Sequence, residues 1–254
     1  MPIPIIDRPG RRLLVGALGL CAAGLLVLPP AFAAELRSAT CALTISNATI
    51  IALSNHLSGE SFVAAPPNLT PLAHLHRIGE PLLDVASTTE QWADNQLSQR
   101  ADWTNAGAQF EFRASVDPAS GDVIITQSGA CSAKKLSGIS WGLANIPASF
   151  EVLVPGCSGQ RFNADSPAGR REFDYPMLWE APFVLLQGKA GGFLIWAEDA
   201  QYRYKNLVVE HARRASRLRF ESRNTAPFEE LDRIASSRWR ITPYRGPWQT
   251  GAAL

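Results

Sequence analysis

The sequence predicts an all-β fold, a large antiparallel two-sheet supersandwich that follows an N-terminal signal peptide. Three observations lead to this prediction. Short apolar runs rich in branched and aromatic residues recur along the chain, with turn residues roughly every eight to twelve positions. Most runs alternate polar with apolar side chains, whereas a central pair is apolar throughout, as expected where two large sheets stack. No sustained amphipathic helix, strand–helix rhythm or internal repeat is visible in the sequence.

Residues 1–34 have the composition of a secretory signal peptide. Arg8, Arg11 and Arg12 precede an uninterrupted apolar stretch at residues 13–28, and Pro-Pro-Ala-Phe-Ala-Ala follows at residues 29–34. A basic start, an apolar middle and an A-x-A-like end are typical of an export signal that is cleaved. We therefore expect cleavage near Ala33 or Ala34 and a periplasmic or extracellular protein, with an uncleaved anchor as the alternative.

The remaining chain divides into a predicted β-supersandwich at residues 35–242 and a closing linker at residues 243–254. Two hairpins are expected early, at residues 41–53 and at residues 109–126, where clean alternation is interrupted by turn residues. Residues 89–102 carry loosely spaced apolar side chains, so we expect a short helix or a loop there. Two further strands are expected at residues 139–143 and 150–154.

The central strands of the fold are predicted at residues 183–186 and 193–197. Both runs are too short for ordinary helices, and neither alternates, so we expect both faces of both strands to be covered. Gly191 and Gly192 lie between the runs and can supply the positive φ of a tight hairpin turn. After this hairpin, arginines alternate with apolar residues as far as Arg245, which indicates outer strands with a solvated face.

Charge and ligand spacing exclude several classes of function. The formal net charge of +1 argues against a dedicated nucleic-acid binder. His74 and His76 would lie on one face of an extended segment, but a metal site needs a third ligand, and His56 and His211 are distant in the sequence. We therefore predict no metal and no cofactor.

Three cysteines remain after removal of the signal peptide, namely Cys41, Cys131 and Cys157. In an oxidising compartment an odd number allows at most one intramolecular disulfide and leaves a spare thiol. We expect Cys131 to pair with Cys157, because both lie at strand ends on either side of one strand region. Three free thiols are the alternative.

A serine-hydrolase motif occurs once, at residues 138–142, where Gly-Ile-Ser-Trp-Gly matches G-x-S-x-G around Ser140. That chemistry needs the serine on a strand-to-helix turn. Asp174 or Asp199 and then His211 follow in a permitted order, but Pro147 lies where the helix should run. We interpret the motif as part of a strand and keep a Ser140 hydrolase as an alternative.

Trp179, Glu180, Trp196 and Asp199 are our candidates for a carbohydrate-binding surface. An aromatic plane can contact the apolar face of a pyranose while carboxylates accept hydrogen bonds from its hydroxyls. The alternative is that the large aromatic side chains fill the core. The adjacent carboxylates Glu198 and Asp199 point to opposite faces of a strand, so they cannot form a glycosidase pair.

Two segments resemble the β-sandwich domain that precedes the catalytic barrel in certain glycoside hydrolases. They are WGLANIPASFEVLVPGCSGQRF at residues 141–162 and DYPMLWEAPFVLLQGKAGGFLIWAEDAQYRYKNL at residues 174–207. The ending RWRITPYRGPWQTGAAL, residues 238–254, is similar to the linker that enters such a barrel. The resemblance implies a galactose-mutarotase-like supersandwich that packs on the barrel and is not itself catalytic. The hydrolase carboxylates would lie in the barrel, so none is assigned to this sequence.

We therefore predict an exported, carbohydrate-associated module, an accessory domain or fragment of a glycoside hydrolase without catalytic activity of its own. Its expected partners are an oligo- or polysaccharide and a separate catalytic barrel, with no nucleic acid and no membrane after signal cleavage. One alternative is a stand-alone enzyme, either the Ser140 hydrolase or an epimerase-like sandwich, for which no histidine–glutamate motif is recognisable. The other is a structural module that binds a partner through residues 243–254.

Overall fold

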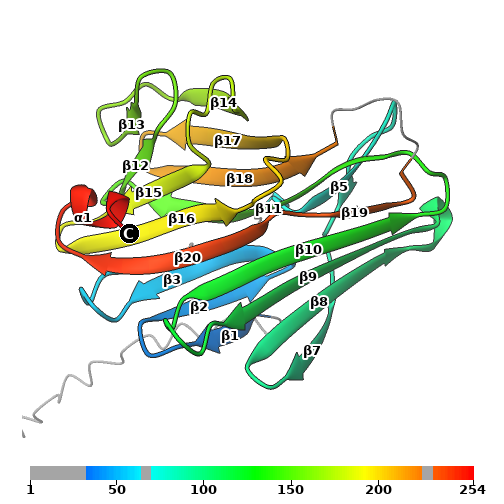
Figure 1. The fold of residues 1–254 in the computed structure, drawn as a ribbon, viewed down its shortest axis with the longest axis horizontal. Helices are drawn as coiled ribbons and strands as arrows, with labels where there is room; N and C mark the ends of the chain where they lie inside the picture. Colours follow the sequence, from blue (N-terminus) through cyan, green and yellow to red (C-terminus); the bar gives the residue numbers. More distant parts are fainter. Residues whose placement is uncertain (1–32, 64–69, 225–230) are drawn as a thin grey trace, which may run out of the picture.

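The computed structural model describes residues 33–63, 70–224 and 231–254. The predicted signal peptide, apart from Ala33 and Ala34, lies outside the described residues. Two ten-stranded sheets, sheet A and sheet B, stack face to face and confirm the all-β prediction (Figure 1). Within the described part of the chain, no helix is long and apolar enough to cross a membrane.

Sheet A begins with the N-terminal strands. Its order is β1 (Ala34–Arg37), β2 (Cys41–Ser46), β3 (Thr49–Asn55), β11 (Leu136–Pro147), β18 (Ala215–Arg223), β17 (Lys205–Ala212) and β14 (Gly169–Tyr175). β4 (Ser61–Val63) pairs with β3, β5 (His74–Arg77) pairs with β11, and β6 (Leu83–Asp84) pairs with β5. The β3–β11 pair is parallel, and the other described pairs of this sheet are antiparallel.

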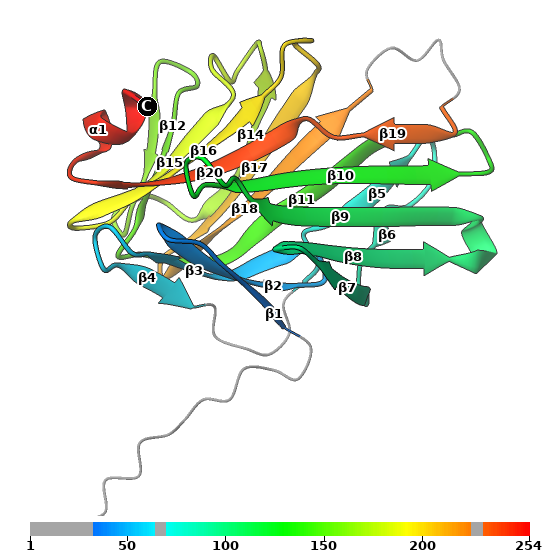
Figure 2. The same cartoon turned by 60° about the horizontal axis from the view of Figure 1, so that its bottom comes forward.

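Sheet B contains the predicted central hairpin. Its order is β13 (Gln160–Phe162), β12 (Glu151–Val154), β15 (Phe183–Gln187), β16 (Gly191–Glu198), β20 (Arg238–Arg245), β10 (Val123–Cys131), β9 (Ala108–Val116), β8 (Gln96–Trp103) and β7 (Thr89–Ala93). β19 (Arg233–Ala235) pairs with β10 beyond the point where β20 begins. A short 3-10 helix, η1 (Thr104–Ala106), joins β8 to β9, and α1 (Trp248–Ala252) follows β20. Figure 2 shows α1 and β19 at opposite ends of this sheet.

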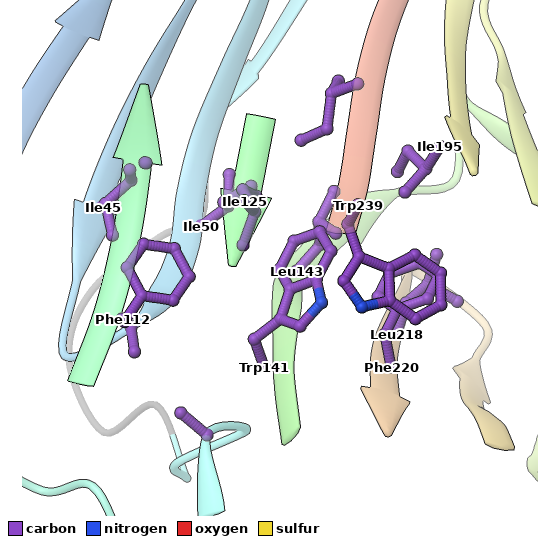
Figure 3. Packing of buried hydrophobic residues seen from close by; sticks show 14 of the residues in the cluster. Ile45, Ile50, Phe112, Ile125, Trp141, Leu143, Ile195, Leu218, Phe220 and Trp239 are labelled. Atoms are coloured by element: carbon purple, nitrogen blue, oxygen red, sulfur yellow. The ribbon is translucent and has the colours of Figure 1, made fainter. Parts of the chain in front are cut away.

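The core between the sheets is built around three buried tryptophans, Trp141, Trp179 and Trp239. Trp141 stacks on Phe220 with ring centroids 4.8 Å apart, and Trp239 stacks on Trp179 at 6.2 Å. Figure 3 shows Trp141 and Trp239 side by side above Phe220. Large aromatic side chains bury much apolar area each, so this cluster is a main source of cohesion between the two sheets.

The central hairpin is confirmed, but its glycines have a different role from the predicted one. Gly191 and Gly192 belong to β16, and neither has a positive φ. A Cβ atom on Gly192 would lie 2.0 Å from the carbonyl oxygen of Leu186 and 2.6 Å from the hydroxyl of Tyr244. These glycines therefore allow neighbouring strands to approach closely.

Residues 89–102, expected as a short helix or loop, form most of the β7–β8 hairpin instead. Asp94 and Asn95 supply the turn, with φ values of 43° and 61°. Consecutive positive φ values suit a two-residue hairpin turn, and Asp and Asn tolerate them better than most residues. The Asp94-Asn95 dipeptide was the signal that the apolar spacing concealed.

The predicted Cys131–Cys157 disulfide is wrong, because all three described cysteines are free. Cys131 ends β10, whereas Cys157 follows β12, and β15, β16 and β20 lie between these two strands. Four strand spacings amount to roughly 19 Å, far beyond the span of a disulfide. The Sγ atoms of Cys131 and Cys157 instead lie 3.8 Å from the carbonyl oxygens of Ala106 and Leu178 respectively.

The segment expected to be a linker, residues 243–254, continues the sandwich in the structure. Pro243 pairs with Phe193 and Arg245 with Gly191, so β20 remains in register with β16 to its end. α1 then folds back over the ends of β15, β16 and β20 (Figure 1). Gly251 makes this possible, because a Cβ atom there would lie 2.4 Å from the ring of Tyr244.

Candidate functional site

The structure does not bring the four predicted carbohydrate-binding residues together. Trp179 is a core residue with no exposed face. Its indole Nε1 donates a hydrogen bond to the carbonyl oxygen of Phe183 at 3.0 Å. Glu180 is exposed in the same loop, and its carboxylate accepts a hydrogen bond from the backbone N–H of Ser158 at 3.0 Å.

Asp199 belongs to a buried ion cluster. Its carboxylate is 2% exposed and accepts hydrogen bonds from Lys205 Nζ, the backbone N–H of Arg203 and Arg203 Nε. Burial alone would raise the pKa of Asp199, but these donors and positive charges outweigh burial and lower the pKa to about 2. Lys205 is equally buried, at 1% exposure, so the cluster is a structural connection between β17 and the end of β16.

Trp196 is the predicted aromatic residue that lies on an open surface. It belongs to the outer face of sheet B, the face turned away from the core, and it packs against Leu194 and neighbouring apolar side chains. We call this group the apolar platform; it comprises Leu153, Phe183, Leu185, Leu194, Trp196 and Tyr244. Leu153, Phe183 and Trp196 are only partly buried, so the expected cover over this face of the central strands is incomplete.

A groove of about 340 Å³ extends the apolar platform to α1. Its lining includes Leu153, Phe183 and Leu185 from the sheet and Trp248 and Ala252 from α1. Trp248 is 43% exposed, although it is one of the largest apolar side chains in the protein. The helix and the sheet therefore form one continuous apolar surface.

Ion pairs border the apolar platform on the side of β20. Arg240 binds Glu198 and also donates to Asp117 at 2.8 Å and to Asp122 at 3.0 Å. Arg238 pairs with the other oxygen of Glu198 at 2.9 Å. An apolar centre with a charged rim is the usual composition of a protein–protein contact surface.

Tyr244 joins the apolar platform to the turn before β16. Its hydroxyl donates to the side-chain oxygen of Gln187 at 2.9 Å, and burial raises the pKa of Tyr244 well above its usual value. The uncharged phenol thus serves as a fixed support on which α1 rests.

The outer face of sheet A carries a second cluster, which is polar and largely buried. Its centre is Glu221, whose side chain is 0% exposed. Arg219 Nε donates to it at 2.7 Å, Arg223 Nε at 2.6 Å and Asn206 Nδ2 at 3.2 Å. Burial would raise the pKa of Glu221, but the interaction with His76, once that ring is protonated at low pH, and with the guanidinium groups of Arg219 and Arg223 outweighs burial and lowers the pKa.

His74 and His76 lie beside this cluster on β5. Burial lowers the pKa of His76 to about 4, so its ring is neutral at pH 7. His74 Nδ1 contacts Asp84 Oδ1 at 2.9 Å. Sequence reasoning did not connect His76 with Glu221, because strand pairing through β11 brings them together from distant positions. Among the described residues, no group of three His, Cys, Asp or Glu could hold a metal ion.

Ser140 has the environment of a strand residue. It is fully buried in β11, its Oγ donates to the carbonyl oxygen of Leu72 at 3.2 Å, and it accepts from the backbone N–H of His74 at 3.1 Å. His76 Nε2 is 3.5 Å away, whereas His211 contacts Ser216 instead. A nucleophilic serine needs an exposed Oγ at a strand-to-helix turn, and neither condition is met.

Comparisons with known proteins find likeness in structure alone. No protein-family model matches the chain, and no curated protein matches it in sequence. The alpha-N-acetylgalactosaminidase NagBb from Bifidobacterium bifidum matches 86% of this chain with a TM-score of 0.59 and 11% identity. An alpha-galactosidase from Lactobacillus brevis matches 85% with a TM-score of 0.55 and 9% identity. The GH36 alpha-galactosidase AgaA from Geobacillus stearothermophilus matches 85% with a TM-score of 0.51 and 8% identity.

The chain shares its fold with part of these glycosidases. It spans 37%, 40% and 41% of the three solved chains, so each contains a larger part that has no counterpart in this sequence. The structural likeness agrees with the β-sandwich resemblance found in the sequence. Because the sequence identities are 8–11%, this likeness shows a shared fold and nothing further.

Proposed function

We propose that this protein is an exported accessory β-sandwich module of a glycoside hydrolase, without catalytic activity of its own. Its apolar platform and α1 would pack against a catalytic domain. The observation that carries this proposal is the continuous apolar surface from Trp196 to Trp248 on an otherwise complete sandwich. An antiparallel sheet normally exposes a polar outer face, so an apolar outer face implies a covering partner.

The partner is inferred to be a glycosidase domain for two reasons. The fold matches about two fifths of several solved glycosidases, so in those proteins a sandwich of this kind exists beside further structure. The charged rim around Glu198 and Arg238 gives the surface the apolar-centre and polar-rim composition of interdomain contacts.

Export is part of the proposal. β1 begins at Ala34, so cleavage after Ala33 would leave the first strand whole. N-terminal sequencing of the secreted protein should find residue 34 or 35 first. A protein that retains residues 1–34 and remains with the membrane would contradict export by cleavage.

Docking can be tested with separately expressed domains. Each glycoside hydrolase barrel encoded in the source genome is mixed with the full chain and examined by analytical ultracentrifugation. One barrel should bind, and Leu194→Asp should abolish the complex, whereas Glu172→Gln on sheet A should leave it intact. Absence of any complex would contradict docking. Hydrolysis of aryl glycosides by the chain alone would contradict a non-catalytic role.

A second candidate function is carbohydrate binding at Trp196. Its partly exposed indole lies two residues from Glu198 on the same strand face, so an aromatic surface and a carboxylate are adjacent. Affinity electrophoresis in gels containing galactomannan, xylan or starch should then show retardation that Trp196→Ala removes. Equal mobility in all gels would exclude this candidate for those polymers.

A further inference from the structure

The outer face of sheet B has a second hollow at the end opposite α1, on β8, β9, β10 and β19. Strand pairing arranges its side chains in two rows across the sheet. One row consists of Arg100, Glu111, Ser128 and Ala235, and the other of Asp102, Gln109, Ala130 and Arg233. Paired residues on neighbouring strands point to the same face, so these eight side chains form one surface. We call it the β10 trough.

The shape of the β10 trough follows from side-chain size. Ser128, Ala130 and Ala235 are short and form the floor, whereas Arg100 on β8 and Arg233 on β19 are long and rise on either side. The resulting cavity measures about 470 Å³. An adjoining hollow of about 540 Å³ shares Gln109, Ala130 and Arg233 with this cavity and continues to Trp103. Small-molecule sites commonly have volumes of roughly 300–1,000 Å³.

Apart from Glu111, the polar side chains of the β10 trough have no side-chain partner among the described residues. Arg100, Asp102, Gln109, Ser128 and Arg233 make no side-chain hydrogen bond or ion pair with any described residue. Other long charged side chains on the same sheet face are mostly engaged: Arg113 binds Glu111 at the margin of the trough, and Arg240 binds Asp117 and Asp122. Donors and acceptors therefore converge on this cavity without being used.

The charges in the two adjoining hollows balance. Arg100 and Arg233 are opposed by Asp102 and Asp232, and Glu111 is neutralised by Arg113. Such a surface offers hydrogen-bond donors and acceptors without a net field, which suits a neutral, hydroxyl-rich ligand better than an anion. Trp103 adds a partly exposed aromatic ring at the far end.

We propose that the β10 trough binds a neutral oligosaccharide of two or three sugar residues. The cavity and its free polar groups are independent of the proposed function. The choice of a saccharide as the ligand rests on the proposed association with a glycosidase. Arg100 and Arg233 donate to sugar hydroxyls, Asp102 and Gln109 accept from them, and Trp103 contacts the apolar face of the terminal ring.

The β10 trough is distinct from the apolar platform. Trp196 pairs across the sheet with Arg240, which pairs with Ile124. Ser128 lies four residues further along β10, roughly 13 Å away along the strand. The ion cluster of Arg240, Asp117 and Asp122 lies beside the platform at the opposite end of β10, at the β9–β10 turn. A catalytic domain on the platform and a saccharide in the trough would therefore occupy different parts of the sheet.

Isothermal titration calorimetry on the full chain tests the proposal, with maltotriose, cellotriose, mannotriose and raffinose as probes. At least one trisaccharide should bind, and Arg100→Ala and Arg233→Ala should each weaken it about tenfold. Ser128→Tyr, which fills the floor with a residue that strands favour, should abolish binding. Arg171→Ala on sheet A is the matched control, because it also removes an exposed arginine without a partner, and it should change nothing.

Four results would overturn the proposal. They are failure of all probes to bind, binding that survives Ser128→Tyr, loss of binding in Trp196→Ala alone, and competition by 10 mM inorganic phosphate, which would identify an anion site. None of these results affects docking of a catalytic domain. Conversely, trisaccharide binding with no barrel partner found would support the β10 trough and contradict the proposed accessory role.

Discussion

Each sheet has unusual residues on its outer face, and the two sheets differ in whether neighbouring residues provide the interactions that these residues need. On sheet A the exception is a buried carboxylate, Glu221, and its own neighbours Arg219, Arg223 and Asn206 bind it. On sheet B the exceptions are apolar side chains around Trp196 and unpartnered polar groups around Arg233, and the described residues do not complete either set.

This difference distinguishes unusual residues that stabilise the fold from unusual residues that are available for binding. A buried charge with a full set of partners needs nothing from outside the molecule, however unusual it looks. An apolar surface or a polar cavity without partners leaves free energy available for binding. Substitutions on the two faces should therefore have different effects on stability and on binding.

Removal of the Glu221 carboxylate from sheet A should cause the largest loss in the free energy of unfolding. Glu221→Ala leaves Arg219 and Arg223 without their buried partner, and loss of one member of a buried ion cluster costs about 3 kcal/mol or more. Urea denaturation should show this loss in the free energy of unfolding. Glu172→Ala, at the exposed pair with Arg170, is the control and should change stability by less than about 1 kcal/mol. Equal effects would show that Glu221 is not a structural centre.

Acid should weaken sheet A through His76. Its pKa is about 4 in the folded protein and near 6.5 when unfolded, so the unfolded chain takes up a proton first as the pH falls. The contribution of His76 to stability is therefore complete above pH 6.5 and declines towards pH 4, by about 3 kcal/mol. Glu221, Arg223, His74 and Arg219 are the charged or titratable groups that act on His76.

The measurement is the urea midpoint as a function of pH for wild type and His76→Gln. The variant should show a flatter profile between pH 6.5 and 4. Asp199 contributes in the same direction at lower pH, because its folded pKa of about 2 lies below its ordinary value. Parallel profiles for wild type and variant would exclude His76 as the titrating group.

Substitutions in the apolar platform should affect binding and leave stability nearly unchanged, in contrast to substitutions in the buried cluster on sheet A. Trp196→Ala should alter the stability of the isolated chain little, because the indole is partly exposed, but weaken a catalytic-domain complex about tenfold. Sedimentation equilibrium with the binding barrel measures the affinity, and urea denaturation of the free chain is the control. A large loss of stability with unchanged affinity would place Trp196 in the core instead of at an interface.

The smallest effect is expected at the rim of the apolar platform. Arg238→Gln removes a half-exposed charge from its pair with Glu198. Rim charges act mainly on encounter rates, so the association rate constant should change about two- to threefold and lose part of its salt dependence. Stopped-flow measurements at two ionic strengths test this. A change confined to the dissociation rate would contradict a rim position.

The predictable parts of this molecule were those governed by local pattern. Alternation and apolar runs predicted the all-β class and the β9–β10 and β15–β16 hairpins, because strand periodicity is a local property. The hairpin at Asp94-Asn95 was not predicted, because apolar spacing carries no information on turn residues, which mark this hairpin instead. The role of Gly192 depends on Leu186 and Tyr244, the latter of which approaches only in the folded sheet.

The candidate site was less predictable for the same reason. Trp179, Trp196 and Asp199 appear similar in sequence, each in or near a short apolar run, yet one lies in the core, one on an open face and one in a buried ion cluster. The β10 trough combines β8, β9, β10 and β19, and its composition depends on register across four strands. Register of this kind is set by tertiary pairing and is not visible in a single segment.

The clustered tryptophans of the core also give the protein an internal optical reporter. Trp141 and Trp239, and Trp239 and Trp179, have ring centroids about 6 Å apart in a dry interior, close enough for their electronic transitions to couple. Trp92 and Trp248, by contrast, are exposed to solvent. Near-ultraviolet circular dichroism should therefore follow the integrity of the sandwich, while quenching of fluorescence by iodide should follow the surface. The two signals allow unfolding of the core and occupation of the α1 groove to be observed independently in one unlabelled sample.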